Sequence, residues 1–191
     1  APRVVHFPTV VDVARFVPAA APPDALRLVW MGSPSTTPHL RVAADSLRDV
    51  PGLTADLYGA ASEGLDWPGA TRHPWRLETE VHALQQATVG IMPLAPGEWT
   101  RGKCALKALQ YMACGLPCVA TPFGAVCDII RHNENGLFAD TPAEWRAALN
   151  QLRDPAERAR LGRAGRATVE ADYSLVQAAS RLAALLREVA A

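Results

Sequence analysis

Three cationic side chains stand close together in the run EWTRGKCALK, residues 98–107. Arg101, Lys103 and Lys107 fall within seven residues, at the start of an expected helix. Cations beside the free N–H groups of a helix N-terminus suit a phosphate or diphosphate group. The alternative is that Arg101 and Lys103 are solvated loop charges. We favour a binding role, because cations at a helix start are slightly unfavourable without an anion.

A polar stripe continues along the expected helix 104–114. Lys107, Gln110, Tyr111 and Cys114 recur at the spacing i, i+3, i+4 and i+7, and the neighbouring positions are mostly Ala, Leu and Met. A helix this apolar is expected to be largely buried, so its polar stripe faces either solvent or a cleft. The residues alone leave both alternatives open.

Hydroxyl side chains mark another loop, GSPSTT at residues 32–37, between an expected strand and an expected helix. Helix N-termini attract phosphate through unpaired N–H groups, and Ser33, Ser35 and Thr36 add donors beside Gly32. Ordinary helix capping is the alternative for these residues. Neither a G-x-G-x-x-G nor a Walker A motif occurs, which argues against a dinucleotide or P-loop site.

Trp75 follows His73 and Pro74 at the end of a short expected strand. Its ring could stack on a nucleobase, and core packing is the more frequent alternative. The other histidines are scattered, and no metal-ligand cluster or Ser/His/Asp arrangement stands out, so no metal is expected. The four cysteines form no C-x-x-C pair and are interpreted as reduced thiols of a cytosolic protein: Cys104, Cys114, Cys118 and Cys127.

The elements that must position these residues alternate along the chain. Strands are expected at 4–7, 26–32, 53–59, 69–75, 88–94, 117–121 and 136–139, and helices at 39–50, 77–87, 104–114, 124–132, from 142, 155–171 and 174–190. This alternation predicts an α/β, Rossmann-like parallel sheet with helices on both faces. Ligands bind at the carboxyl ends of such strands, which directs attention to loops 32–37, 59–68, 73–78, 94–103 and 122–126.

Composition narrows the function classes. The 191 residues are 49% hydrophobic and 20% charged, with 19 basic and 19 acidic side chains. These values are ordinary for a globular protein, and the balanced charge favours neither a nucleic acid nor an anionic membrane as partner. No apolar run is long enough to span a bilayer and no signal peptide is visible, so a cytoplasmic location is expected.

Several segments together resemble the C-terminal, donor-binding domain of the group 1 retaining glycosyltransferases, which have the GT-B architecture. The resemblance spans nearly the whole chain, through FPTVVDVARFVP (7–18), LVWMGSPSTTPHL (28–40), LQQATVGIMPL (84–94) and RLGRAGRATVEADYSL (160–175). Its most specific part is RGKCALKALQYMACGLPCVATPFGAVCDIIRHNENGLFAD (101–140).

The resemblance implies one half of a GT-B fold. Residues 1–172 would form the nucleotide-sugar-binding domain, and helix 173–191 would pack toward an N-terminal acceptor domain that the chain lacks. The implied reaction transfers a sugar, with retention, from a nucleotide-diphosphate sugar to an acceptor that the sequence does not reveal. This chain alone would be inactive, no cofactor would be needed, and any peripheral membrane link would come through the missing domain.

The resemblance also assigns roles to residues. Lys107 would reach the diphosphate with help from Arg101 and Lys103, Gln110 would bind the ribose hydroxyls, and Trp75 would lie in the base-binding loop. The remaining substrate-binding residues that it implies are Gly32, Ser33, Ser35, Thr36, Gly102, Cys104 and Ala105.

Two positions depart from the family pattern. Gln110 and Gly102 stand where the family usually has the two glutamates of its motif, and Glu98 lies nearby in a different register. Since a Gln amide both accepts and donates, ribose binding can survive, whereas Gly102 supplies no carboxylate for the role of the first glutamate near the sugar. The alternative function is therefore a non-catalytic nucleotide- or partner-binding module. A nucleotide-sugar epimerase lacks support in the motifs.

Overall fold

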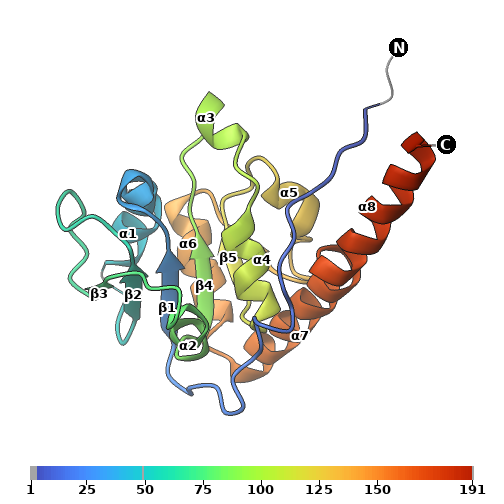
Figure 1. Cartoon of the computed structure of the whole chain (residues 1–191). Helices are drawn as coiled ribbons and strands as arrows, with labels where there is room; N and C mark the ends of the chain where they lie inside the picture. The colour runs from blue at the N-terminus through green and yellow to red at the C-terminus, as the bar shows by residue number, and fades with distance from the viewer. Residues whose placement is uncertain (1–3, 49, 191) are drawn as a thin grey trace.

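A parallel sheet forms the centre of the computed structural model, which describes residues 4–48 and 50–190 (Figure 1). Within these residues the sheet has six strands in the order β3-β2-β1-β4-β5-β6. The strands are β1 (Arg27–Met31), β2 (Thr54–Tyr58), β3 (Ala70–His73), β4 (Val89–Met92), β5 (Cys118–Ala120) and β6 (Leu137–Phe138). The predicted parallel sheet is confirmed, and the change of direction between β1 and β4 creates a crevice at their carboxyl ends.

The central strands are buried on both faces, as their continuous apolar runs require. Side chains of β1 alternate between two cores, with Val29 and Met31 on one side and Leu28 and Trp30 on the other. All four residues of β4 are buried. Each core is closed by a separate layer of helices.

Helices cover both faces of the sheet. One face packs against α2 (Glu80–Gln85), α4 (Leu106–Ala113) and α5 (Val126–Ile129). The other packs against η1 (Pro34–Leu40), α1 (Arg41–Leu47) and α6 (Pro142–Gln151). Helix α7 (Pro155–Asp172) reaches both cores, because Leu161 lies in one and Val169 in the other.

The two predicted helix starts with a proline at the first position are confirmed. Thr141 and Glu144 exchange hydrogen bonds at the start of α6, with Glu144 N–H donating to Thr141 Oγ1 at 3.3 Å and Thr141 N–H to Glu144 Oε2 at 2.9 Å. At the start of α7, the Asp154 carboxylate accepts from Ala156 N–H at 2.8 Å. Local capping chemistry therefore defines these boundaries.

Some of the sequence predictions are wrong. The strand expected at 4–7 is not a strand, and its residues are exposed, with Phe7 beneath the guanidinium of Arg181 on α8 (Leu175–Ala190) at 5.8 Å. A short apolar run becomes a strand only where a partner strand is available, and this run lies against a helix. Conversely, α3 (Glu98–Arg101) is a one-turn helix inside the stretch predicted as loop 94–103.

Helix α8 projects from the sheet alongside the N-terminal segment (Figure 1). Ala178 is its only fully buried residue among those described, and Leu182, Leu186 and Val189 are exposed. The boundary between 172 and 173 stays a prediction, and residues 1–3 and 191 of the proposed domains lie outside the described residues. In the described part of the chain, no helix is both long and apolar enough to cross a membrane.

Candidate functional site

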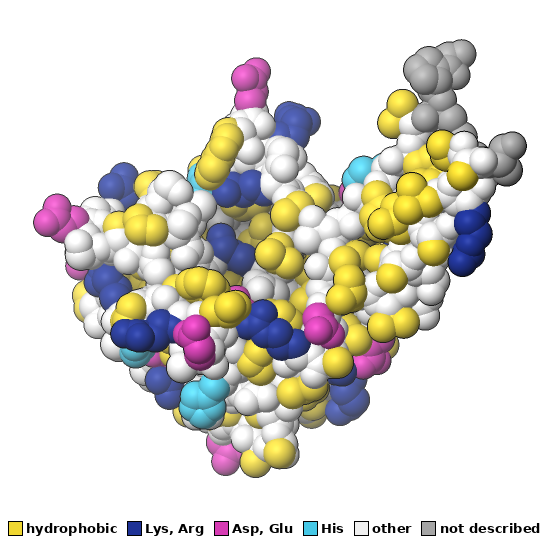
Figure 2. All heavy atoms as spheres, viewed as in Figure 1, with side chains coloured by type: hydrophobic (Ala, Val, Ile, Leu, Met, Phe, Trp, Pro, Cys, Tyr) yellow, Lys and Arg dark blue, Asp and Glu magenta, His cyan; other side chains and the backbone are white. Residues whose placement is uncertain are grey.

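Two cavities open near the carboxyl ends of the strands. One, of about 400 Å³, is bounded by the N-terminal segment, the connection between α3 and α4, and α5. The other, of about 530 Å³, is lined by residues that include Gly32, Ser33, Gly59, His73 and Trp75. Figure 2 shows the surface hollowed below the projection that carries α3 and toward α8, with cationic side chains beneath this projection; we call this hollow the cleft.

Close packing fixes α4 against the sheet. A Cβ atom at Gly90 of β4 would lie 2.3 Å from the ring of Tyr111, so only glycine lets the ring sit on this strand. The Tyr111 hydroxyl accepts a hydrogen bond from Met31 N–H at 3.0 Å, at the end of β1. These contacts hold the first turn of α4, with Lys107, beside the carboxyl end of β1.

Lys107 is largely buried. Its Nζ is 5.0 Å from the ring centroid of Trp30, which is itself buried. Burial, and to a lesser degree the charge of Lys103, lowers the pKa of Lys107 to about 8. No carboxylate forms an ion pair with Lys107 among residues 4–48 and 50–190. Of the polar stripe, Tyr111 and Cys114 pack in the core and only Lys107 and Gln110 are partly exposed, so neither alternative holds for the stripe as a whole. Lys107 is a cation without a carboxylate partner in the described part of the chain.

Lys103, the only other lysine in the sequence, lies near it on an aromatic ring. The Nζ of Lys103 is 3.7 Å from the ring centroid of Trp99 on α3, a side chain that is 64% exposed. Burial lowers the pKa of Lys103. His39 stacks on Trp99 with ring centroids 6.3 Å apart, and burial, followed by the charges of Lys103 and Lys107, lowers its pKa. The cleft is thus already positive enough to disfavour another cation.

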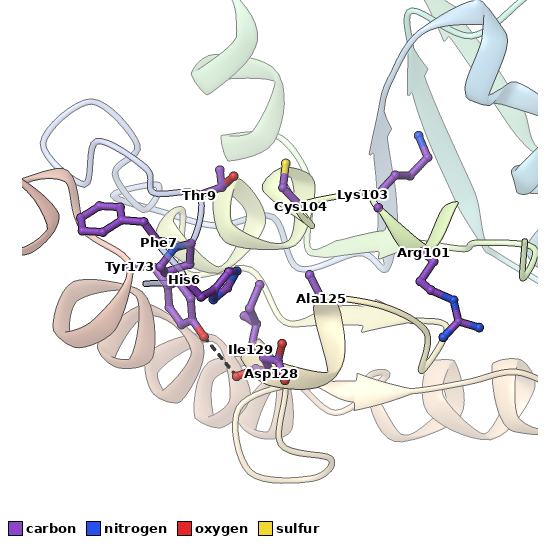
Figure 3. Close-up of a pocket in the computed structure, with 12 residues that line it drawn as sticks. His6, Phe7, Thr9, Arg101, Lys103, Cys104, Ala125, Asp128, Ile129 and Tyr173 are labelled. Carbon is purple, nitrogen blue, oxygen red and sulfur yellow. Dashed lines mark hydrogen bonds between the residues drawn. The ribbon is translucent and has the colours of Figure 1, made fainter. Parts of the chain in front are cut away.

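The segment from Arg101 to Cys104 lines the first cavity (Figure 3). Arg101 is exposed, with its guanidinium 5.4 Å from the ring centroid of Phe123. In Figure 3, Arg101 and Lys103 lie on the opposite side of the cavity from His6 and Tyr173. Gly102 and Cys104 are exposed. Of the three cations that the sequence singled out, Arg101 and Lys103 line this cavity, and Lys107 lies close enough to Lys103 to feel its charge.

Ala105 differs from its neighbours in this segment. It is buried and has a left-handed backbone, with φ 55° and ψ 26°, at the residue preceding α4. A non-glycine residue in this conformation is sparsely populated and persists where the surrounding structure enforces it. Its predicted part in binding is open only to its backbone, because its side chain is enclosed.

The hydroxyl side chains of loop 32–37 differ in their roles: some cap the following helix and others are exposed. Thr36 Oγ1 donates to the Ser33 carbonyl at 2.9 Å and accepts from Ser33 N–H at 3.1 Å, so it is occupied within its own turn. Ser33 and Ser35 are exposed, and their hydroxyls are 3.0 Å apart. The capping alternative accounts for Thr36, while Ser33 and Gly32 line the second cavity.

Trp75 does not pack in the core, since it is 45% exposed and lines the second cavity. His73, two residues before it, stacks on Tyr58 at a centroid distance of 4.7 Å. The Nε2 of His73 lies 2.7 Å from Asp56 Oδ1, and Arg27 donates to Asp56 Oδ2. Burial alone would raise the pKa of Asp56, but these two hydrogen bonds outweigh it and lower the pKa. The end of β3 is therefore firmly held beside the cavity.

Gln110 has a partner that sequence reasoning missed. Its amide Nε2 donates to Glu80 Oε1 at 3.0 Å, although the two residues lie 30 positions apart. Glu80 is only 6% exposed. An acidic residue in the first turn of a helix is so common that nothing in the local sequence marks Glu80 as special. His39 was likewise counted only among the scattered histidines.

The described residues hold no group of three or more His, Cys, Asp and Glu side chains placed to bind a metal ion. Arg101 and Lys103 line the first cavity together with one carboxylate, Asp128, and Lys107 is buried more deeply within reach of the charge of Lys103. Such an arrangement favours an anion.

Comparisons with known proteins bear on the kind of ligand that such a site could bind. A family model described as glycosyl transferases group 1 matches residues 10–154. A D-inositol 3-phosphate glycosyltransferase of Thermobispora bispora is 28% identical over 188 residues, covering 87% of this chain and 44% of the relative. One of Acidothermus cellulolyticus is 34% identical over 145 residues, covering 73% and 28%. The chain thus spans less than half the length of these curated relatives.

Solved structures share the fold. A sucrose-phosphate synthase from Thermosynechococcus elongatus matches with a TM-score of 0.78 at 19% identity, over 96% of this chain and 52% of that one. Anabaena Alr3699/HepE, in complex with UDP and glucose, matches with 0.74 at 16% identity, over 93% and 55%. The C-terminal domain of the group 1 glycosyl transferase LpcC from Francisella tularensis matches with 0.65 at 20% identity, over 86% and 99%.

Proposed function

Because the chain belongs to the group 1 glycosyltransferases, as the C-terminal domain of their GT-B fold, we propose that it binds a nucleotide-diphosphate sugar. In this proposal it forms part of a longer protein that transfers the sugar, with retention of configuration, to an acceptor hydroxyl. The single observation that carries the proposal is Lys107, a largely buried cation without a carboxylate partner in the described part of the chain.

The residues of the cleft take complementary roles in this proposal. Lys107 binds the diphosphate, with Arg101 and Lys103 at the mouth of the cleft, and Gln110 binds a ribose hydroxyl one turn further along α4. Trp75, half exposed beside His73, provides a face on which a base stacks. Backbone and hydroxyl groups of Gly32, Ser33, Ser35, Gly102, Cys104 and Ala105 complete the surface of the site.

Transfer breaks the bond between the anomeric carbon and the β-phosphate oxygen and forms one to the acceptor oxygen, whose proton leaves with the nucleoside diphosphate. Negative charge develops on the departing diphosphate, and preorganised cations stabilise such charge. We propose that Lys107, Arg101 and Lys103 supply this stabilisation in place of a metal ion.

Two names among the comparisons suggest the substrates. HepE is solved with UDP and glucose, which supports a uridine nucleotide as donor. The curated relatives are named for D-inositol 3-phosphate, which supports a phosphorylated polyol as acceptor of the whole protein.

A thermal-shift panel of UDP, GDP and ADP sugars, followed by calorimetry, tests donor binding. Lys107→Ala should weaken diphosphate binding by about 1–3 kcal/mol, the contribution of a hydrogen bond to a charged group. Arg163→Ala, which removes an exposed cation from α7, should leave the affinity unchanged. An unchanged affinity in Lys107→Ala would refute the assignment.

A non-catalytic binding module is the second candidate, favoured by Gly102 and Gln110 at the two motif positions. The same cleft would then bind a nucleotide without transferring its sugar. The two candidates are distinguished by assaying transfer in the longer protein, since donor binding is expected from both.

A further inference from the structure

The buried carboxylate of Glu80 joins three segments of the chain. Its Oε1 accepts hydrogen bonds from Gln110 Nε2 on α4 at 3.0 Å and from Trp75 Nε1 at 3.4 Å. Its Oε2 forms an ion pair with Arg15 Nη2 at 2.9 Å. A buried charge is tolerated when it is paired and hydrogen-bonded in this way, so both oxygens of Glu80 are accounted for.

These contacts determine how the Gln110 amide is turned. An ionised carboxylate accepts hydrogen bonds and donates none, so Gln110 must direct its NH₂ group at Glu80. Its oxygen then points the other way. Within the described part of the chain no donor reaches this oxygen, and the only fully buried side-chain polar atom without a partner is Trp145 Nε1. The Gln110 oxygen is therefore an acceptor open to solvent.

The open oxygen lies on the same face of α4 as Lys107, one turn further along the helix. An unconstrained glutamine would present either its oxygen or its NH₂ group to a ligand. Glu80 removes this choice, so residue 110 offers an acceptor and, in this respect, behaves like one oxygen of a carboxylate. A hydroxyl group is the neutral ligand group that such an acceptor selects.

We propose that Glu80 is a positioning residue that fixes the Gln110 oxygen toward the cleft, where it accepts a hydrogen bond from a ribose hydroxyl of the nucleotide. This role rests on the proposed function. Glu80 thereby makes the site select ribonucleotides over analogues that lack the hydroxyls, although it does not itself contact the ligand. A ligand without the hydroxyl leaves the fixed acceptor unpaired.

The test compares the affinities of UDP and 2′,3′-dideoxy-UDP by calorimetry, with GDP and ADP pairs run in parallel. The base and diphosphate are the same within each pair, so the affinity ratio reports the hydroxyls alone. The unaltered chain should favour the ribonucleotide by about tenfold, the effect of one such hydrogen bond. Inorganic pyrophosphate serves as a third ligand. It lacks the ribose and so reports diphosphate binding alone.

Glu80→Gln should lower this ratio to about twofold or less, while pyrophosphate affinity stays unchanged. The introduced amide should turn its one oxygen toward the Arg15 guanidinium, so that its NH₂ group faces residue 110 and Gln110 turns its oxygen inward. Trp75 Nε1 loses its acceptor in this variant, which affects both members of a nucleotide pair alike. The double change Glu80→Gln with Gln110→Glu places an acceptor-only group at 110 again and should restore the ratio. Arg15→Met removes a different partner of Glu80 and should keep the ratio.

Three results would overturn the proposal. An unchanged ratio in a folded Glu80→Gln variant would show that Glu80 does not orient Gln110. If Glu80→Gln fails to fold, a lost ratio in the double variant would lead to the same conclusion. Equal binding of ribo- and dideoxynucleotides by the unaltered chain would refute the proposed recognition of the hydroxyls but not the proposed nucleotide binding. If no nucleotide binds, the proposed function is overturned as well.

Discussion

At the scale of single residues, Lys107 shows how a binding group is held in a setting that disfavours its own charge. Its pKa of about 8 lies below the ordinary lysine value of 10.5, chiefly because of burial. The protonated side chain therefore destabilises the unliganded fold below pH 8, and this cost disappears as the pH rises toward 10.5. A bound anion would favour the charged form and reverse the shift.

Nucleotide affinity should consequently depend on pH. Above the pKa of about 8, the free site loses its proton and must regain it to bind a diphosphate, so affinity should fall by up to about tenfold per pH unit. Lys103, whose pKa is also lowered, acts in the same direction, while His39 is already neutral in this range. Calorimetry between pH 7 and about pH 9 measures the slope.

Lys107→Arg provides the control for this titration, because arginine stays protonated throughout the range. The nucleotide affinity of Lys107→Arg should change little with pH, apart from the smaller effect of Lys103. A slope in Lys107→Arg equal to that of the unaltered chain would mean that Lys107 is not the titrating group.

The cysteines offer a second measurement at this scale. Cys104 and Cys127 are exposed, whereas Cys114 and Cys118 are buried, and burial raises the pKa of the Cys114 thiol to about 12. A thiol reagent should modify the first two and spare the others, since the thiolate is the reactive form. A nucleoside diphosphate should slow the modification of Cys104, which lies beside Lys103, and leave Cys127 unaffected.

Peptide mass spectrometry reads the two sites separately, so Cys127 acts as an internal control. Equal rates at Cys104 with and without a nucleotide known to bind would place the ligand elsewhere.

Sequence reasoning identified the cations of this site but not the partner of Gln110. Arg101, Lys103 and Lys107 are near one another along the chain, so their spacing predicted a common cleft. Glu80 reaches Gln110 only because α2 and α4 pack on the same face of the sheet. Such a contact depends on the folded chain and leaves no local pattern.

At the scale of elements, the position of the site depends on how α4 docks. The Tyr111 hydroxyl accepts the Met31 N–H inside the core, and its removal would leave that buried donor without a partner. Tyr111→Phe should therefore lower the free energy of unfolding by about 1–3 kcal/mol, measured by urea denaturation.

Tyr173→Phe is the matched control for this change. Its hydroxyl donates to the Asp128 carbonyl at 3.1 Å at an exposed position, where water replaces the lost group. We expect a change within about 0.5 kcal/mol, typical of surface sites. If both variants lose the same stability, the hydrogen bond to Met31 is not what secures α4.

The alternation of strands and helices could be predicted from the sequence, because strands and helices show themselves in local periodicity and helix starts in their capping residues. The starts of α6 and α7 followed from Thr141-Pro142 and Asp154-Pro155, whose hydrogen bonds are made within a few residues. The failures occurred where tertiary packing decides. Residues 4–7 pack against helix α8 and not against a strand. Helix α3 has only one turn, which is too short for a periodic pattern in the sequence to reveal.

At the scale of the whole molecule, the chain has a covered sheet and an uncovered helix. Leu182, Leu186 and Val189 of α8 are exposed, and the chain spans less than half the length of its curated relatives. The resemblance implies that α8 packs toward an N-terminal acceptor domain. We propose that this domain covers α8 and faces the cleft in the longer protein.

This arrangement predicts donor binding without transfer by the 191-residue chain. Transfer requires an acceptor hydroxyl held against the anomeric carbon. Losing such positioning removes an effective concentration of about 10⁵ M or more. The chain should bind UDP-glucose in calorimetry yet release no UDP above background when a phosphorylated polyol is added.

A two-domain relative assayed with the same donor and acceptor provides the positive control. Robust release of UDP by this chain, at a rate comparable with that of the relative, would contradict the proposal that a second domain is needed to bind the acceptor. It would mean that the described cleft positions both substrates, and the cavity of about 400 Å³ beside Cys104 and Asp128 would then be the place to look for the acceptor.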